Sequence, residues 1–141
     1  SFDIREWNIR CDAESALAVL NHSPIPILYS GNEVGGCIIS GQSLADQPED
    51  YPLRDCYYEL NNAYQTNECT RNSWDLVVAY YAVYGDTGLW GRQDGYEVEV
   101  DEQGRTRFAP GGIHSYLVPD YSKTDEICAI FNEQMAVDNR K

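Results

Sequence analysis

Apolar residues recur at helical spacing in several stretches of the chain. Residues 10–22 carry an apolar stripe from Ala16 to Leu20 behind Asp12, which is the expected N-cap of a helix. Near the end of the chain, Ile127 and Phe131 recur at the same spacing. The pattern predicts helices over residues 10–22, 53–64, 74–84 and 122–135.

The helix predicted over residues 74–84 has a polar start and an apolar body. Ser73 is the expected N-cap, with a hydroxyl that accepts a backbone N–H of the first turn. Asp75 follows in the first turn, where the helix dipole favours negative charge. Because the body is apolar nearly all round, we expect this helix to be buried on most sides.

The remaining apolar runs predict strands. Residues 25–29 form a short apolar run bounded by proline and glycine, as in a buried strand of a parallel sheet. Residues 4–9 are interpreted as the end of another strand. A period of two predicts a hairpin of residues 96–100 and 105–108, followed by a turn at 110–112 and a strand at 114–118.

Helix, short turn and apolar strand in succession predict an α/β fold built around a parallel sheet, with a β-hairpin and a final helix. No linker or internal repeat divides residues 1–141, so the chain is interpreted as a single segment. The glycine-containing stretch 30–39 is expected to be a loop at the carboxyl end of a strand. Open α/β sheets bind ligands at that place.

Charge narrows the classes of partner. The chain has 23 acidic and 10 basic residues, for a net charge of −13. This balance argues against nucleic acid polymers and against an anionic membrane surface, since both require basic residues. Nucleosides and neutral sugars remain compatible with it. The sequence has no apolar run of transmembrane length, so we expect a soluble protein, either cytoplasmic or secreted.

The cysteines do not predict a metal site. They stand at positions 11, 37, 56, 69 and 128, without a C-x-x-C pair and without a histidine at zinc-binding spacing. An odd number of widely spaced cysteines favours mostly free, packed thiols. One or two disulfides remain the alternative if the protein is secreted.

Polar groups beside tryptophans are the candidates for chemistry. Glu6 and Asn8 flank Trp7, and Asp75 follows Trp74. Carboxylates and amides bond vicinal hydroxyls while indole rings stack on a sugar or base, so the set suits a neutral polyhydroxy ligand. A hard cation with oxygen ligands fits the same groups. The alternative is equally open: the tryptophans are core residues and the polar groups are caps.

The order of these segments resembles the nucleoside hydrolases. The segment Glu6-Trp7-Asn8-Ile9 is similar to the family's Glu-aromatic-Asn signature, and residues 12–16 to the helix after it. Residues 26–35 resemble the next strand and loop, and residues 73–76 a late helix whose Asp binds calcium and ribose. The hairpin and the final helix follow in the family's order, so the resemblance spans nearly the whole chain.

The resemblance implies hydrolysis of the N-glycosidic bond of nucleosides by a calcium-bound water, which an Asp deprotonates. Asp75 would be a calcium ligand and would contact ribose. Glu6 and Asn8 would bond ribose hydroxyls, holding the sugar in a form close to the oxocarbenium-like transition state. Trp74 would stack on the base or form a wall of the pocket.

Two departures from the family pattern matter. The Asp-x-Asp-x-Gly-x-Asp-Asp cluster, which supplies the base and most metal ligands, is not in this sequence. Several family members also place a His before the late Asp to protonate the leaving base, and here that residue is Trp74. No catalytic residue is therefore expected in this chain.

We expect the chain to be the carboxyl-terminal portion of a larger calcium-dependent hydrolase, and the start at Ser1 without an initiator Met agrees with this. A missing N-terminal segment or a partner chain would complete the site, and the chain alone would be inactive. Two alternatives are a non-catalytic sugar-binding module and a structural interaction domain. An exposed sheet edge would favour a homo-oligomer.

Overall fold

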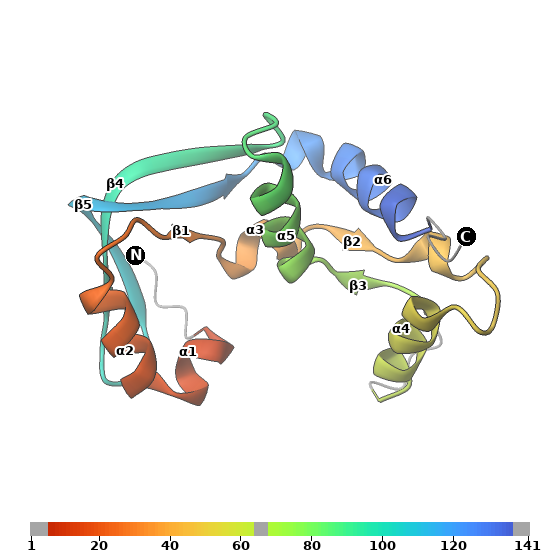
Figure 1. Cartoon of the computed structure of the whole chain (residues 1–141), viewed down its shortest axis with the longest axis horizontal. Helices are drawn as coiled ribbons and strands as arrows, with labels where there is room; N and C mark the ends of the chain where they lie inside the picture. The colour runs from red at the N-terminus through yellow and green to blue at the C-terminus, as the bar shows by residue number, and fades with distance from the viewer. Residues whose placement is uncertain (1–5, 64–67, 137–141) are drawn as a thin grey trace. The chain divides into compact units, whose positions relative to one another are not determined.

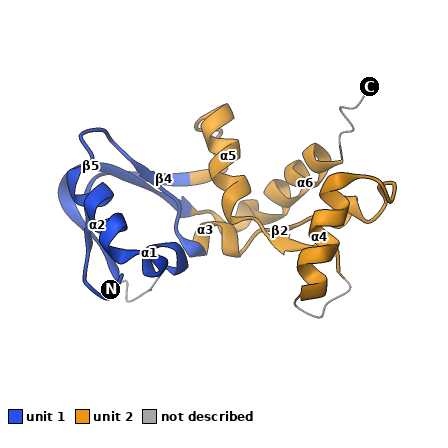
Figure 2. Cartoon of the chain, turned by 60° about the horizontal axis from the view of Figure 1, so that its bottom comes forward, with its two compact units in different colours: residues 1–32, 91–118 blue, residues 33–90, 119–141 orange. Residues whose placement is uncertain are grey.

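The computed structural model describes residues 6–63 and 68–136, and all structural statements concern these residues. The chain is a mixed α/β protein with a mixed-direction sheet, a β-hairpin and a C-terminal helix (Figure 1). It forms two compact units (Figure 2). Unit 1 comprises residues 1–32 and 91–118, and unit 2 comprises residues 33–90 and 119–141.

Unit 1 begins with two consecutive helices, α1 (Trp7–Cys11) and α2 (Ala13–His22). Asp12 separates them and caps α2, as predicted: its carboxylate accepts hydrogen bonds from the Ser15 N–H (3.0 Å) and hydroxyl (2.8 Å). The prediction of a strand over residues 4–9 is wrong for residues 7–9, which belong to α1, and its first two residues lie outside the described part of the chain. The Arg10 N–H donates to the Glu6 carbonyl (2.9 Å), so the chain turns here instead of extending.

The sheet of unit 1 has the strand order β1-β5-β4. The short strand β1 (Leu28–Tyr29) runs parallel to β5 (Thr106–Pro119), with Leu28 opposite Ser115, so the predicted parallel pairing is confirmed. The predicted burial is wrong, because both residues of β1 are only half-buried and Ile25 is 65% exposed. Strand β4 (Trp90–Val100) forms the predicted hairpin with β5. Its turn is closed by the Asp101 N–H, which donates to the Arg105 carbonyl (3.0 Å).

Two boundaries of the hairpin differ from the prediction. Strand β4 starts at Trp90, before residue 96 where the hairpin was expected to begin, and β5 continues through the turn expected at 110–112. Gly112 explains the second difference, because a Cβ at this position would lie 2.3 Å from the Tyr96 carbonyl oxygen. The glycine therefore permits close approach of the two strands. On β5 itself, the ring centres of Phe108 and Tyr116 lie 4.9 Å apart.

Unit 2 contains mostly helices. They are α3 (Asn32–Gly36, whose first residue belongs to unit 1), the 3₁₀ turn η1 (Gln42–Leu44), α4 (Pro52–Ala63), α5 (Trp74–Tyr84), the 3₁₀ turn η2 (Tyr121–Lys123) and α6 (Thr124–Met135). The strands β2 (Ile39–Ser40) and β3 (Arg71–Asn72) pair antiparallel. The helices predicted near α4, α5 and α6 are confirmed, whereas α3 forms where a loop was expected.

The core of unit 2 gathers apolar side chains mainly from α3, η1, α5 and α6. Its most buried apolar residues are Val34, Ile38, Leu44, Val77, Ile127 and Phe131. The Asn132 side chain ties α6 to the preceding part of the unit, because its Oδ1 accepts the N–H groups of Gly41 (3.0 Å) and Ser43 (3.2 Å).

Helix α5 is less buried than predicted. Val77 is its one fully buried residue among those described, while Val78, Val83 and Tyr84 are 49%, 73% and 55% exposed. The described part of unit 2 packs against one side of the helix and leaves the other apolar sides open. Among the described residues no helix is both long and apolar enough to cross a membrane.

Candidate functional site

The start of α5 is held by backbone contacts. The Ser73 N–H donates to the carbonyls of Ile38 (2.9 Å) and Gly35 (3.1 Å). Ser73 occupies the N-cap position, but its hydroxyl bonds the Ser40 hydroxyl (2.6 Å) and makes no capping bond, so the predicted side-chain cap is wrong. Both serines are buried, and an unpaired buried hydroxyl is costly. The bond between the two hydroxyls is therefore more favourable than a helix cap by Ser73.

Gly35 brings α3 against the first residue of α5. A Cβ at this position would lie 2.4 Å from the Cα of Trp74, closer than real side chains approach. The glycine is therefore needed for the contact of the two backbones rather than for an unusual backbone angle. Together with the Ser73 bonds, it makes the start of α5 a rigid support for the next side chains.

Asp75 lies in the first turn of α5, next to this support. Its carboxylate is exposed in the first turn of α5 and has no hydrogen bond or ion pair with the described residues. The helix dipole favours a negative charge there. Trp74 beside it is half-buried, and the Arg71 guanidinium lies 5.8 Å from the centre of its ring. A carboxylate without a structural partner is available to a ligand.

Glu6 and Asn8 lie at the start of α1 in unit 1. Glu6 is half-buried, and its Oε1 accepts the Asn32 N–H (3.2 Å), which leaves Oε2 for another donor. Asn8 is exposed. Trp7 between them is 67% exposed with the Arg10 guanidinium 4.8 Å from its ring, so the interpretation of Trp7 as a core residue is wrong.

The predicted site residues thus form two pairs. Glu6 and Asn8 belong to unit 1, and Trp74 and Asp75 belong to unit 2. The members of each pair are close together in the sequence, and we describe each pair within its own unit. Across residues 6–63 and 68–136, no three His, Cys, Asp or Glu side chains gather in a way that could hold a metal ion.

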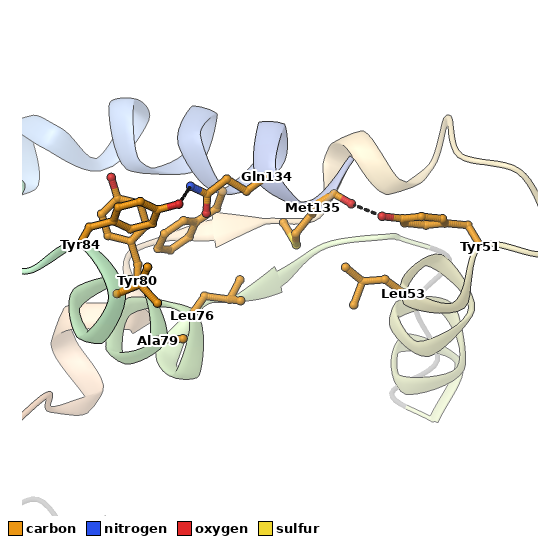
Figure 3. A pocket seen from close by; sticks show the side chains of 10 residues that line it. Tyr51, Leu53, Leu76, Ala79, Tyr80, Tyr84, Gln134 and Met135 are labelled. Atoms are coloured by element: carbon orange, nitrogen blue, oxygen red, sulfur yellow. Dashed lines mark hydrogen bonds between the residues drawn. The ribbon is translucent and has the colours of Figure 1, made fainter. Parts of the chain in front are cut away.

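Sequence reasoning missed a groove in unit 2 (Figure 3). Its walls come from α5, from α6 and from the start of α4. The lining residues are Tyr51, Leu53, Leu76, Ala79, Tyr80, Val83, Tyr84, Phe131, Gln134 and Met135. We call it the α5/α6 groove. The five residues of α5 among them recur at intervals of three and four, which was a readable signal in the sequence.

Aromatic rings and hydrogen bonds shape this groove. The Tyr80 ring packs against Phe131, with ring centres 5.8 Å apart. At one end, the Gln134 amide donates to the Tyr84 hydroxyl (3.4 Å), and at the other the Tyr51 hydroxyl donates to the Met135 carbonyl (2.7 Å) (Figure 3). The polar groups that border the groove therefore bond one another, and its surface is mainly apolar.

A second groove lies in unit 1, between the end of α2 and the hairpin, and His114 lines it. His114 is 6% exposed, and its Nδ1 accepts the Ile27 N–H (3.1 Å). The next backbone bond, from the Ser115 N–H to the Ile27 carbonyl (3.0 Å), fixes the same segment. His114 thus attaches the approach to β1 onto β5, which is a structural role.

The five cysteines are free thiols, as favoured by their number and spacing. Two of them, Cys11 and Cys56, are exposed rather than packed. Burial raises the pKa of the Cys69 and Cys128 thiols, so the reactive thiolate is scarcer at these positions than in a free cysteine. Neither of these two thiols has the environment of a nucleophile.

Comparison with known proteins adds no relative: no family model, no curated protein and no solved structure matches the chain.

Proposed function

We propose that this chain is the ribose-binding, carboxyl-terminal portion of a larger calcium-dependent hydrolase, which cleaves the N-glycosidic bond of ribonucleosides. In this proposal its fold is part of a nucleoside-hydrolase-like α/β domain. The observation that supports it is the Asp75 carboxylate, which is exposed, has no partner among the described residues and stands on a rigid helix start. The resemblance of residues 73–76 to the family's late helix adds to this support.

The chemistry of Asp75 fits both ligands of such a site. A carboxylate is a preferred ligand of calcium, which binds six to eight oxygens, and it also accepts hydrogen bonds from vicinal hydroxyls. When bound, the cation lowers the pKa of a coordinated water and so supplies the nucleophile. One carboxylate is far from a complete ligand set, so the remaining ligands belong to the Asp-rich segment that this sequence lacks.

The other residues of the proposal position the sugar and the base. Glu6 has one oxygen held by the Asn32 N–H, and in this proposal its other oxygen accepts a hydrogen bond from a ribose hydroxyl. Asn8 is exposed and adds an amide that donates and accepts. Trp74 forms a wall for the base, and because an indole has no acidic proton at neutral pH, protonation of the leaving base falls to a group outside this chain.

Calorimetry on the 141-residue chain is the first test. We expect no tight calcium site, because a lone exposed carboxylate binds the cation weakly. Tight binding at one site would contradict the proposal. Binding of ribose without calcium would also contradict it and would support a non-catalytic sugar-binding module instead.

The second test uses the protein translated from the complete parent reading frame. We expect that frame to encode an Asp-rich motif upstream, and Asp75→Asn to lower kcat/KM for nucleosides by about a hundredfold or more, as for the loss of a transition-state contact. Asp55→Asn is the matched control, since Asp55 is also in the first turn of an exposed helix. Equal effects of the two substitutions, or a frame without the motif, would refute the proposal.

A further inference from the structure

The α5/α6 groove has the shape of a site for a third helix. On α5, Leu76, Tyr80 and Val83 lie along one face, and Phe131 and Met135 lie along the facing side of α6. Two neighbouring helices with apolar rows form a groove into which the side chains of another helix fit. Amphipathic helices bind such grooves through residues spaced three, four and seven positions apart.

The groove is open to solvent in the described part of the chain. Val83 is 73% exposed, Tyr84 55% and Leu53 37%, and all three line it. These exposed apolar side chains are gathered around one groove and are not scattered singly over the surface. The rings of Tyr80 and Phe131 make its floor firm enough to be a preformed surface.

Charge indicates what covers the groove. Three exposed acidic residues, Asp50, Asp86 and Glu133, lie within two positions of lining residues in the sequence. The basic residues in the described part of unit 2 are Arg54, Arg71 and Lys123, and only Arg54, next to Leu53, is as close in sequence to the lining as the three acids are. A second copy of the chain would bring another net charge of −13 to this acidic surface, which disfavours self-association here.

We propose that the α5/α6 groove binds an amphipathic helix with an apolar stripe and a basic polar face, supplied by a polypeptide other than these 141 residues. Leucine-sized side chains of that helix lie between α5 and α6. Its lysines or arginines face the acidic residues beside the groove. The inference concerns a surface that does not include Asp75, so it is independent of the proposed hydrolase function.

The test measures binding of fluorescent synthetic peptides to the full chain by anisotropy. The probe is a leucine–lysine peptide with leucines at helical spacing. A peptide of the same composition with alternating leucines, and a helical leucine–glutamate peptide, are controls. We expect the first to bind at least tenfold more tightly than either control. Equal binding of the two lysine peptides would show attraction by charge alone and would overturn the proposal.

Two matched variants locate the site. Val83→Asp places a carboxylate in the groove, and Val78→Asp places one on α5 outside the groove, at a side chain that is 49% exposed. We expect about tenfold weaker binding of the helical lysine peptide for Val83→Asp and less than a twofold change for Val78→Asp. Circular dichroism checks that both variants fold. Equal effects, or a self-association that Val83→Asp abolishes in sedimentation, would overturn the proposal.

Discussion

The starts of α2 and α5 solve the same physical problem in different ways. Each helix begins with unpaired backbone N–H groups and has an acidic residue nearby. At α2, Asp12 itself accepts a backbone N–H and the hydroxyl of Ser15. At α5, distant segments hold the start through Ser73 and Gly35, and Asp75 has no bond to the described residues. Because the Asp75 carboxylate is not needed to hold the helix start, it is available for binding.

The largest expected effect concerns the contact that holds α5. Gly35→Ala would place a Cβ 2.4 Å from the Trp74 Cα, so α3 and α5 must separate. We expect the free energy of unfolding in urea to fall by about 2 kcal/mol or more. Gly91→Ala is the control, because its Cβ would lie 3.3 Å from the Val118 Cβ, and it should cost less than about 1 kcal/mol. If both glycines tolerate alanine equally, the start of α5 is not held as described.

The buried serine pair sharpens the comparison. Ser73→Ala removes the hydroxyl that bonds Ser40, a residue that is 0% exposed and also hydrogen-bonds the Tyr57 side chain. We expect a loss of about 1–2 kcal/mol in the free energy of unfolding. The double variant Ser40→Ala/Ser73→Ala removes both polar groups and should recover part of that loss. Strictly additive losses in this double-mutant cycle would mean that the two hydroxyls do not interact.

The smallest expected effects compare the two carboxylates directly. Asp12→Ala removes a side-chain cap and should lower the melting temperature more than Asp75→Ala does. Asp75→Ala removes only a favourable charge at a helix start and should cost less than about 0.5 kcal/mol. Thermal unfolding measures both. A larger loss for Asp75→Ala than for Asp12→Ala would make Asp75 a structural residue and would favour the interaction-domain alternative.

A pH series separates the cap from other contributions of Asp12. The Ser15 backbone N–H, followed by its hydroxyl, lowers the pKa of Asp12 from the ordinary 3.8. A carboxyl whose pKa is lower in the folded state stabilises that state above the unfolded value. This stabilisation disappears as the pH falls through the lowered folded pKa. The difference between the wild type and Asp12→Ala should therefore shrink in acid; a constant difference would assign the effect to helix propensity.

The longer helices were predictable because their signals are local. The apolar spacing and the N-cap at Asp12 place α2, and the predicted range of α5 agrees with Trp74–Tyr84. Helices α1 and α3 were missed because each has only five residues and little periodicity. The continuous strand β5 was missed because glycine at position 112 is also common in turns, and only the neighbouring strand shows which role it has.

For the candidate site, the sequence by itself determined which polar residues stand beside tryptophans and that Asp75 lies in a first helical turn. It also determined the acidic charge that limits the partners. Only the tertiary structure decided that Ser73 pairs with Ser40, that Gly35 supports α5 and that one face of α5 borders an open groove. The physical reason is range: helix periodicity and capping act within a few residues, whereas these contacts join segments that are far apart in the chain.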